Sequence, residues 1–197
     1  MTFNSKFLIA IITTSSILAS ISCTNESHDN DKETPTEIAE EHNDAKFNGE
    51  EENKADYLVD VAASNLSIIK LSELAEQQTT NAKVKIFATK MIAEHKKISA
   101  KINGLAATKK VTIPEDMAYT EADGYKDISG ESGVDFDRDY IDQITNQHQD
   151  FINKMDTTNA DYKDNEVKIF MDDMIPKLRN HVDEAINLKK SLENIKK

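Results

Sequence analysis

The sequence has little of what β-structure and the common catalytic signatures require. Trp is missing from its 197 residues, and aromatic residues make up only 6% of them. No segment shows the strict alternation of apolar and polar residues that is typical of a half-buried strand. The chain also lacks Gly-x-Ser-x-Gly, a phosphate-binding glycine loop and His-Glu-x-x-His, the signatures of common hydrolases, P-loop proteins and zinc proteases. These absences favour an all-α protein that is not an enzyme.

Basic residues are also few. Lys and Arg number 24 against 36 Asp and Glu, which gives a formal net charge of −12. Nucleic acids and anionic membrane surfaces repel a chain with this charge, so we expect no nucleic-acid partner. An acidic surface is compatible with cationic partners or metal ions, but its most general consequence is solubility.

The single cysteine, Cys23, directly follows a segment with the features of an export signal. Lys6 supplies a positive charge, and the apolar run behind it is short for a membrane span. The position of Cys23 is typical of a bacterial lipoprotein, although Ser20 stands where Leu is usual and Ser22 where Gly or Ala is usual. Simple secretion with a free thiol is the alternative. Lipidation accounts for an odd cysteine in an exported protein, so residues 1–22 are interpreted as a lipoprotein signal peptide.

Residues 23–54 are polar and acidic, and almost none of their side chains suits a core. We expect them to form a disordered tether between the lipid anchor and a folded domain at residues 55–197. The protein is then exported and held in the bacterial envelope by its lipid. The outer membrane is the expected location, and the sequence is compatible with either its periplasmic face or its surface face.

An internal repeat predicts the architecture of the folded domain. Residues 84–92 return as residues 167–175, an offset of 83, with six of nine positions identical. The same offset places Tyr57 on Tyr140 without a gap. Two copies of one helical hairpin therefore make up the domain.

Apolar residues recur at helical spacing in four segments. Helices are predicted at residues 55–78, 82–106, 136–159 and 165–195. The connection at about 104–135 holds four of the five glycines and is too long for a tight turn. It is long enough to run the length of a bundle and leaves room for a short helix. The prediction is a ferritin-like four-helix bundle of two repeated hairpins with a long crossover.

Three histidines lie on the apolar stripes of three different helices: His95, His148 and His181. Their distances from the hairpin turns differ by only about one helical turn at about 1.5 Å per residue. Asn65 stands at the repeat position that matches His148, so it also lies near this level. A cluster of the three imidazoles with Asn65 nearby is therefore predicted.

Such a cluster has two interpretations. Neutral imidazoles bind divalent transition metals such as Zn, Cu, Ni or Fe, with Asn65, Glu94 and Glu184 as residues that would support the ligands. Alternatively, the histidines are buried and hydrogen-bonded to neighbouring acids or to one another. The hydrogen-bonded interpretation is favoured, and no cofactor is assigned with certainty.

A di-iron site is disfavoured, because it needs carboxylates that these stripes lack. Such sites use Glu-x-x-His on two helices and a Glu on each of two others. Ile92, Thr145 and Leu178 occupy the positions three residues before the histidines. Ferroxidase and di-iron oxygenase chemistry is therefore not expected.

Several motifs together resemble a large bacterial family built on a domain of unknown function. They consist of Val84, Lys85, Phe87, Ala88, Glu94 and His95; Phe136, Asp137 and Tyr140; His148; and Ile175, Pro176, Leu178, Arg179 and His181. The resemblance spans about residues 55–195. It implies a ferritin-like fold and an exported protein, often labelled a putative outer membrane protein, and it brings no activity. Two departures stand out: Glu94 where Asp is usual, and Ile68 where many members carry Glu.

The leading functional hypothesis is a lipid-anchored envelope protein that acts as a non-catalytic binding or stress-associated module. The alternative is a metal-binding or redox protein that uses the histidine cluster.

Overall fold

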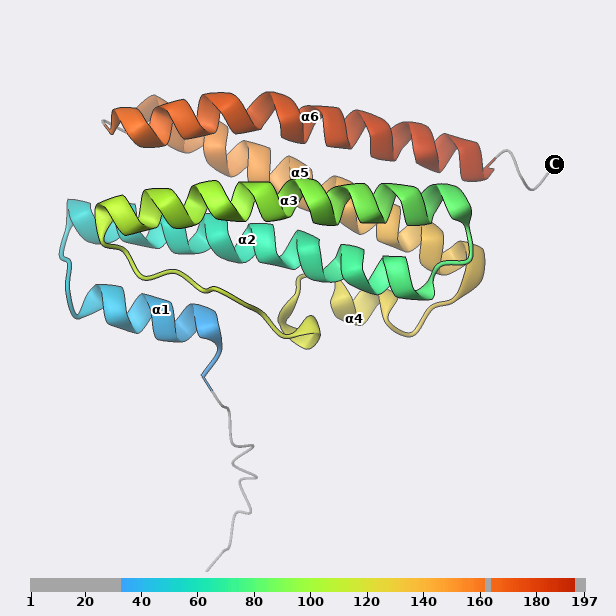
Figure 1. The fold of residues 1–197 in the computed structure, drawn as a ribbon, viewed down its shortest axis with the longest axis horizontal. Coiled ribbons are helices and arrows are strands. Elements are labelled where there is room, and N and C mark those ends of the chain that lie inside the picture. The colour runs from blue at the N-terminus through green and yellow to red at the C-terminus, as the bar shows by residue number, and fades with distance from the viewer. Residues whose placement is uncertain (1–32, 162–163, 194–197) are drawn as a thin grey trace, which may run out of the picture. The chain divides into compact units, whose positions relative to one another are not determined.

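The computed structural model describes residues 33–161 and 164–193. Within them the chain forms six α-helices, one short 3₁₀-helix and no strand (Figure 1). The predicted all-α class is confirmed. No helix in these ranges is both long and apolar enough to cross a membrane. The predicted signal peptide and Cys23 lie outside the described residues.

Four long helices correspond to the four that the sequence predicts. They are α2 (Glu50–Gln78), α3 (Ala82–Lys109), α5 (Gly133–Asp161) and α6 (Asn165–Glu193). Helices α2 and α3 pack as one hairpin and α5 and α6 as another (Figure 1). In addition, α2 contacts α5 and α3 contacts α6. Buried apolar side chains from all four helices form a single core.

Several residues that the repeat places in the same register on α3 and α6 have the same burial. Val84 and Val167 are both buried, each with no more than 1% of its surface exposed. Ile86 and Ile169 instead both face solvent, with 71% and 68% of their surface exposed. The two hairpins therefore orient equivalent helix faces in the same way.

The tether prediction is wrong for the part of residues 23–54 that the structure describes. Helix α1 (Pro35–Asp44) lies in this segment, and α2 begins at Glu50 rather than near residue 55. The Thr34 side chain accepts a hydrogen bond from the Glu37 backbone, the Glu37 side chain caps Thr34 in return, and Pro35 starts the helix. These are strong helix-start signals that the acidic composition obscured.

Helix α1 packs on α2 through small and polar residues. Ala39 and Asn43 lie four residues apart on one face and are buried, while the acidic side chains face water. The Asn43 amide donates to the Thr112 carbonyl (2.8 Å) and accepts from the Thr112 N–H (2.9 Å). Asn43 therefore fastens α1 to the long connection between the hairpins.

The connection is shorter than predicted, because α3 runs to Lys109 and α5 begins at Gly133. It contains a 3₁₀-helix, η1 (Tyr119–Glu121), and the predicted short helix, α4 (Tyr125–Ile128). The segment lies along α2 through η1 and along α5 through α4. Gly124 has φ +74°, a left-handed conformation that favours glycine, and a Cβ there would lie 2.6 Å from the end of the Gln143 side chain, which would have to move.

Two buried polar contacts tie α2 to α5. The Thr79 hydroxyl donates to the Asp137 carboxyl, and the Tyr140 hydroxyl donates to Ser72 at 3.0 Å. Burial raises the pKa of Asp137, and the hydrogen bond from Thr79 only partly opposes this. Both contacts cross from the first hairpin to the second, so they set how the hairpins meet.

Candidate metal centre

The structure brings the three predicted histidines together in the core. His95 comes from α3, His148 from α5 and His181 from α6, and none has more than 2% of its surface exposed. His148 Nε2 lies 3.1 Å from His95 Nε2 and 3.1 Å from His181 Nδ1. One ring nitrogen of each imidazole lies within 4.8 Å of the other two. The chemistry of this cluster depends on where the ring protons are.

The proton of neutral His148 is on the nitrogen that points away from the cluster. His148 Nδ1 lies 2.8 Å from the carbonyl oxygen of Ile144, one turn earlier in α5. A carbonyl can only accept a hydrogen bond, so Nδ1 must carry the proton. Nε2 therefore presents a lone pair to the other two rings.

Asn65 fixes the position of the ring proton of His95 in the same way. The Asn65 amide nitrogen donates to the His95 carbonyl (3.1 Å) and to the Ser99 hydroxyl (2.7 Å), which sets the orientation of the amide. Its oxygen then faces His95 Nδ1 at 2.9 Å and accepts. The neutral His95 ring therefore also carries its proton on the outer nitrogen and presents Nε2 as a lone pair.

Glu94 holds His181. His181 Nε2 donates to Glu94 Oε2 at 2.5 Å. Burial alone would raise the pKa of Glu94, but the hydrogen bond and charge of His181, with help from Lys90 and Lys97, lower it overall. The Glu94 carboxylate is an acceptor only, so the neutral His181 ring presents Nδ1 to the cluster.

When all three rings are neutral, the three inner nitrogens face one another as lone pairs with no proton between them. Burial, followed by the charges of the neighbouring rings, holds the pKa of His95 well below its usual value. Burial and the charge of His181 lower the pKa of His148 to about 3. Near pH 7 the rings of His95 and His148 are neutral, so neither carries a proton on the Nε2 atoms that face each other. A metal ion among the three inner nitrogens would accept a lone pair from each ring.

This arrangement fits a transition metal better than a hard cation. In metal sites the outer N–H of a ligating histidine usually donates to a carboxylate, an amide or a backbone carbonyl. Here Asn65, the Ile144 carbonyl and Glu94 are those acceptors. Three imidazole nitrogens suit Zn²⁺, Cu²⁺, Co²⁺ or Ni²⁺, whereas Mg²⁺ and Ca²⁺ prefer oxygen ligands.

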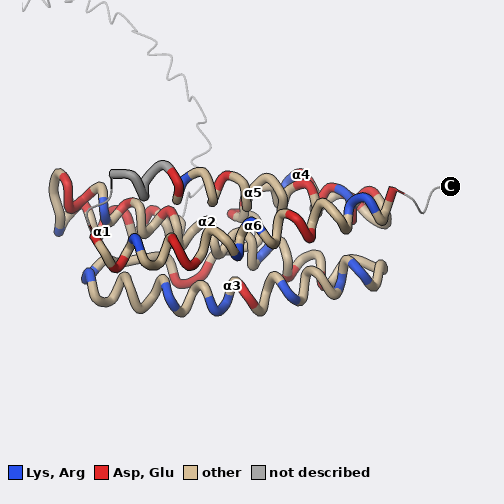
Figure 2. The backbone as a smooth tube through the Cα atoms, turned by 90° about the horizontal axis from the view of Figure 1, so that it is seen from above, with Lys and Arg blue, Asp and Glu red and all other residues tan. Residues whose placement is uncertain are grey.

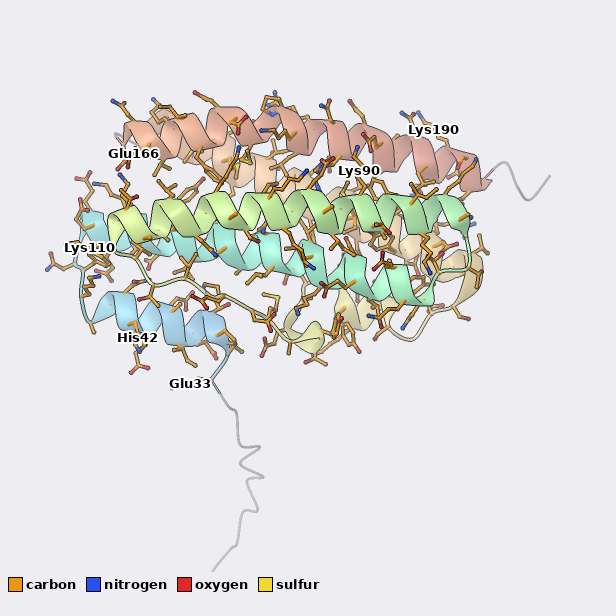
Figure 3. All side chains as sticks on the ribbon, in the orientation of Figure 1. Glu33, His42, Lys90, Lys110, Glu166 and Lys190 are labelled. Carbon is orange, nitrogen blue, oxygen red and sulfur yellow. The ribbon has the colours of Figure 1, made fainter. Side chains whose placement is uncertain are left out.

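Glu184 lies one contact further from the histidine cluster than the sequence predicted. It pairs with Lys90 (Nζ–Oε1 2.5 Å), which lies on α3 and bridges to α6 (Figure 3). Lys90 in turn is 3.9 Å from Glu94. Glu184 therefore influences the site only through Lys90 and Glu94.

Sequence reasoning missed two groups at the site. The Ile144 carbonyl belongs to the backbone, so residue identity gives no sign of its role, although its i, i+4 relation to His148 is a usable signal. Ser99 lies four residues after His95 and shares its helix face. Nothing in the spacing shows that its hydroxyl orients an amide from another helix.

A family model for a domain of unknown function, DUF4142, matches residues 38–188. The chain belongs to this family. The match begins inside α1, in agreement with a folded domain that starts before residue 55. No curated protein and no solved structure matches the chain. Membership of DUF4142 brings no activity, so function has to be argued from the site.

Proposed function

We propose that this protein is a binding module whose ligand is a divalent transition-metal ion, held by His95, His148 and His181. The observation that carries the proposal is the direction of the three rings. Each outer N–H is held by a fixed acceptor, and one inner nitrogen of each ring lies within 4.8 Å of the other two. A buried core gains nothing from lone pairs that face one another, because buried acceptors without donors cost about 1–3 kcal/mol each.

Metal binding is tested by elemental analysis of protein purified without an affinity tag, and by Zn²⁺ titration against a competing chelator. We expect one metal ion per chain, and its loss in the His95→Ala/His148→Ala variant. His42→Ala is the matched control, because His42 is exposed on α1, away from the cluster. Circular dichroism checks that the double variant keeps its helices. Wild-type protein that binds no metal, or binding that the double variant retains, would overturn the proposal.

The module is further proposed to be exported and lipid-anchored in the bacterial envelope. The support is in the sequence: Lys6, a short apolar run and the single Cys23 in succession. Cys23→Ser should abolish both incorporation of labelled fatty acid and fractionation with membranes. A variant that still pellets with membranes after a high-salt wash would show that Cys23 is not the anchor.

The fold is proposed to be a ferritin-like bundle of two repeated hairpins. Four long helices around one core, a connection that follows α2, and matched burial at repeat positions support this topology. An experimental structure in which the two hairpins superpose on each other would bear it out. Hairpins with different helix packing would contradict it.

A further inference from the structure

The histidine cluster is a polar layer between apolar layers of the core. About one helical turn before and after each histidine, an apolar residue of the same helix is buried. These residues are Met91 and Ile98 on α3, Ile144 and Phe151 on α5, and Leu178 and Ala185 on α6. An ion among the inner nitrogens therefore has apolar side chains on both sides along the bundle.

The described residues supply this ion with three ligands. Among their His, Cys, Asp and Glu side chains, only His95, His148 and His181 form a group that could hold a metal. A divalent ion with three protein ligands completes its shell with a water molecule, and a buried water needs about two to four polar partners. The Asn65 amide is already engaged at both ends, by His95 and Ser99. The layer therefore offers little to hold that water in place.

The charge beside the cluster also favours an ion of low charge. Of the carboxylates that the structure describes, only that of Glu94 hydrogen-bonds to one of the three rings. Glu94 is the single acidic residue of α3, which carries seven lysines and is mostly blue at its charged positions in Figure 2. One of these lysines, Lys90, lies 3.9 Å from Glu94 and shares its charge. The site can therefore balance one positive charge, whereas a second would be buried without a partner, which is costly.

We propose that copper in this site is held as Cu⁺ in preference to Cu²⁺. The inference rests on the proposed metal site. Cu⁺ has a filled d shell and a single charge, so it accepts three imidazole ligands without a fourth. Cu²⁺ favours a tetragonal arrangement with more ligands than three. The module then binds a monovalent ion as well as divalent ones.

The test is a comparison of two affinities of the full chain. Cu⁺ binding is measured without oxygen against bicinchoninate, a chelator that is coloured when it holds Cu⁺, and Cu²⁺ binding is measured against a Cu²⁺ chelator. The Kd for Cu⁺ should be lower than that for Cu²⁺ by at least about 100-fold. The His95→Ala/His148→Ala variant should lose the tight Cu⁺ binding, which separates the cluster from sites on the surface.

Two charge variants should move this preference in opposite directions. Glu94→Gln keeps an acceptor for His181 and removes the charge, so it should increase the preference for Cu⁺ by roughly tenfold, because Cu²⁺ loses twice the attraction. Asn65→Asp places a carboxylate beside His95 and should reduce the preference by a similar factor. Glu193→Gln is the matched control, because Glu193 is exposed on α6 about 18 Å from His181 at 1.5 Å per residue. At that distance its charge is screened.

The outcomes separate this inference from the metal site itself. A chain that binds one Zn²⁺ ion but holds Cu²⁺ as tightly as Cu⁺ would overturn the inference and leave the metal site standing. A preference for Cu⁺ that neither charge variant changes would also count against it, because the charge of the site would then not be its source. A chain that binds neither Zn²⁺ nor copper at the cluster would overturn both.

Discussion

Exchanging Asn65 for Asp distinguishes a metal site from a merely hydrogen-bonded histidine cluster. The side chain is 1% exposed, and its oxygen accepts from His95 Nδ1 at 2.9 Å. Its nitrogen donates to the His95 carbonyl and to Ser99. Asp has nearly the same shape, keeps the acceptor, loses both donors and places a carboxylate in the core.

The two measurable consequences have opposite signs. In the metal-free protein, loss of two donors and burial of a carboxylate should lower the free energy of unfolding by about 2–4 kcal/mol. Once a cation binds His95, the introduced carboxylate accepts a charge-assisted hydrogen bond from the ring. Such bonds contribute about 1.5–3 kcal/mol, so Zn²⁺ affinity should match the wild type or exceed it by up to about tenfold.

Urea unfolding of the metal-free protein gives the first quantity, and Zn²⁺ titration against a chelator gives the second. Asn65→Leu is the comparison, because it removes the acceptor as well and should weaken Zn²⁺ binding by about 10- to 100-fold. If Asn65→Asp and Asn65→Leu lose Zn²⁺ affinity equally, Asn65 does not support a metal ligand and the reasoning fails.

Three further predictions concern the metal-free protein. The folded-state pKa of His148 is about 3, below that of an unfolded histidine. Stability should therefore fall as pH drops from about 6.5 towards 3, by about 1.4 kcal/mol per pH unit for each proton taken up on unfolding. The urea midpoint should depend less on pH across this range in His148→Gln, and an unchanged slope would count against the assignment. Asn43→Ala leaves both backbone groups of Thr112 without their partner and should lower the free energy of unfolding by about 1–3 kcal/mol. A denaturation midpoint equal to that of the wild type would show that α1 contributes nothing to stability. Gly124→Ala places an alanine in a left-handed conformation and in contact with Gln143, and it should lower the free energy of unfolding by about 1–2 kcal/mol. Thermal unfolding measures this loss, and an unchanged stability would mean that the turn rearranges.

Much of the fold could be predicted because burial on four helices is periodic. The apolar stripes of α3, α5 and α6 also place one histidine each in the core, so apolar spacing alone located them. The same logic failed at α1, whose packing face holds Ala39 and the polar Asn43. A helix that buries one small residue and one amide has no apolar stripe to detect.

The candidate site was predictable only in part, for a related reason. Helix periodicity tells which face a residue occupies but not which partner it meets across the interface. Asn65 was expected near His148 and in the structure holds His95, while Glu184 meets Lys90 rather than a histidine. Ring orientation depends on acceptors such as the Ile144 carbonyl, which exist only once the backbone is folded.

X-ray absorption at the zinc edge of the Zn²⁺-loaded protein tests the central claim most directly. The account predicts a first shell with three imidazole nitrogens at about 2.0–2.1 Å, together with the outer-ring scattering that imidazoles produce. This scattering should be lost in the His95→Ala/His148→Ala variant. A shell of oxygen ligands alone, or a spectrum that the double variant leaves unchanged, would show that the metal binds elsewhere and would contradict the account.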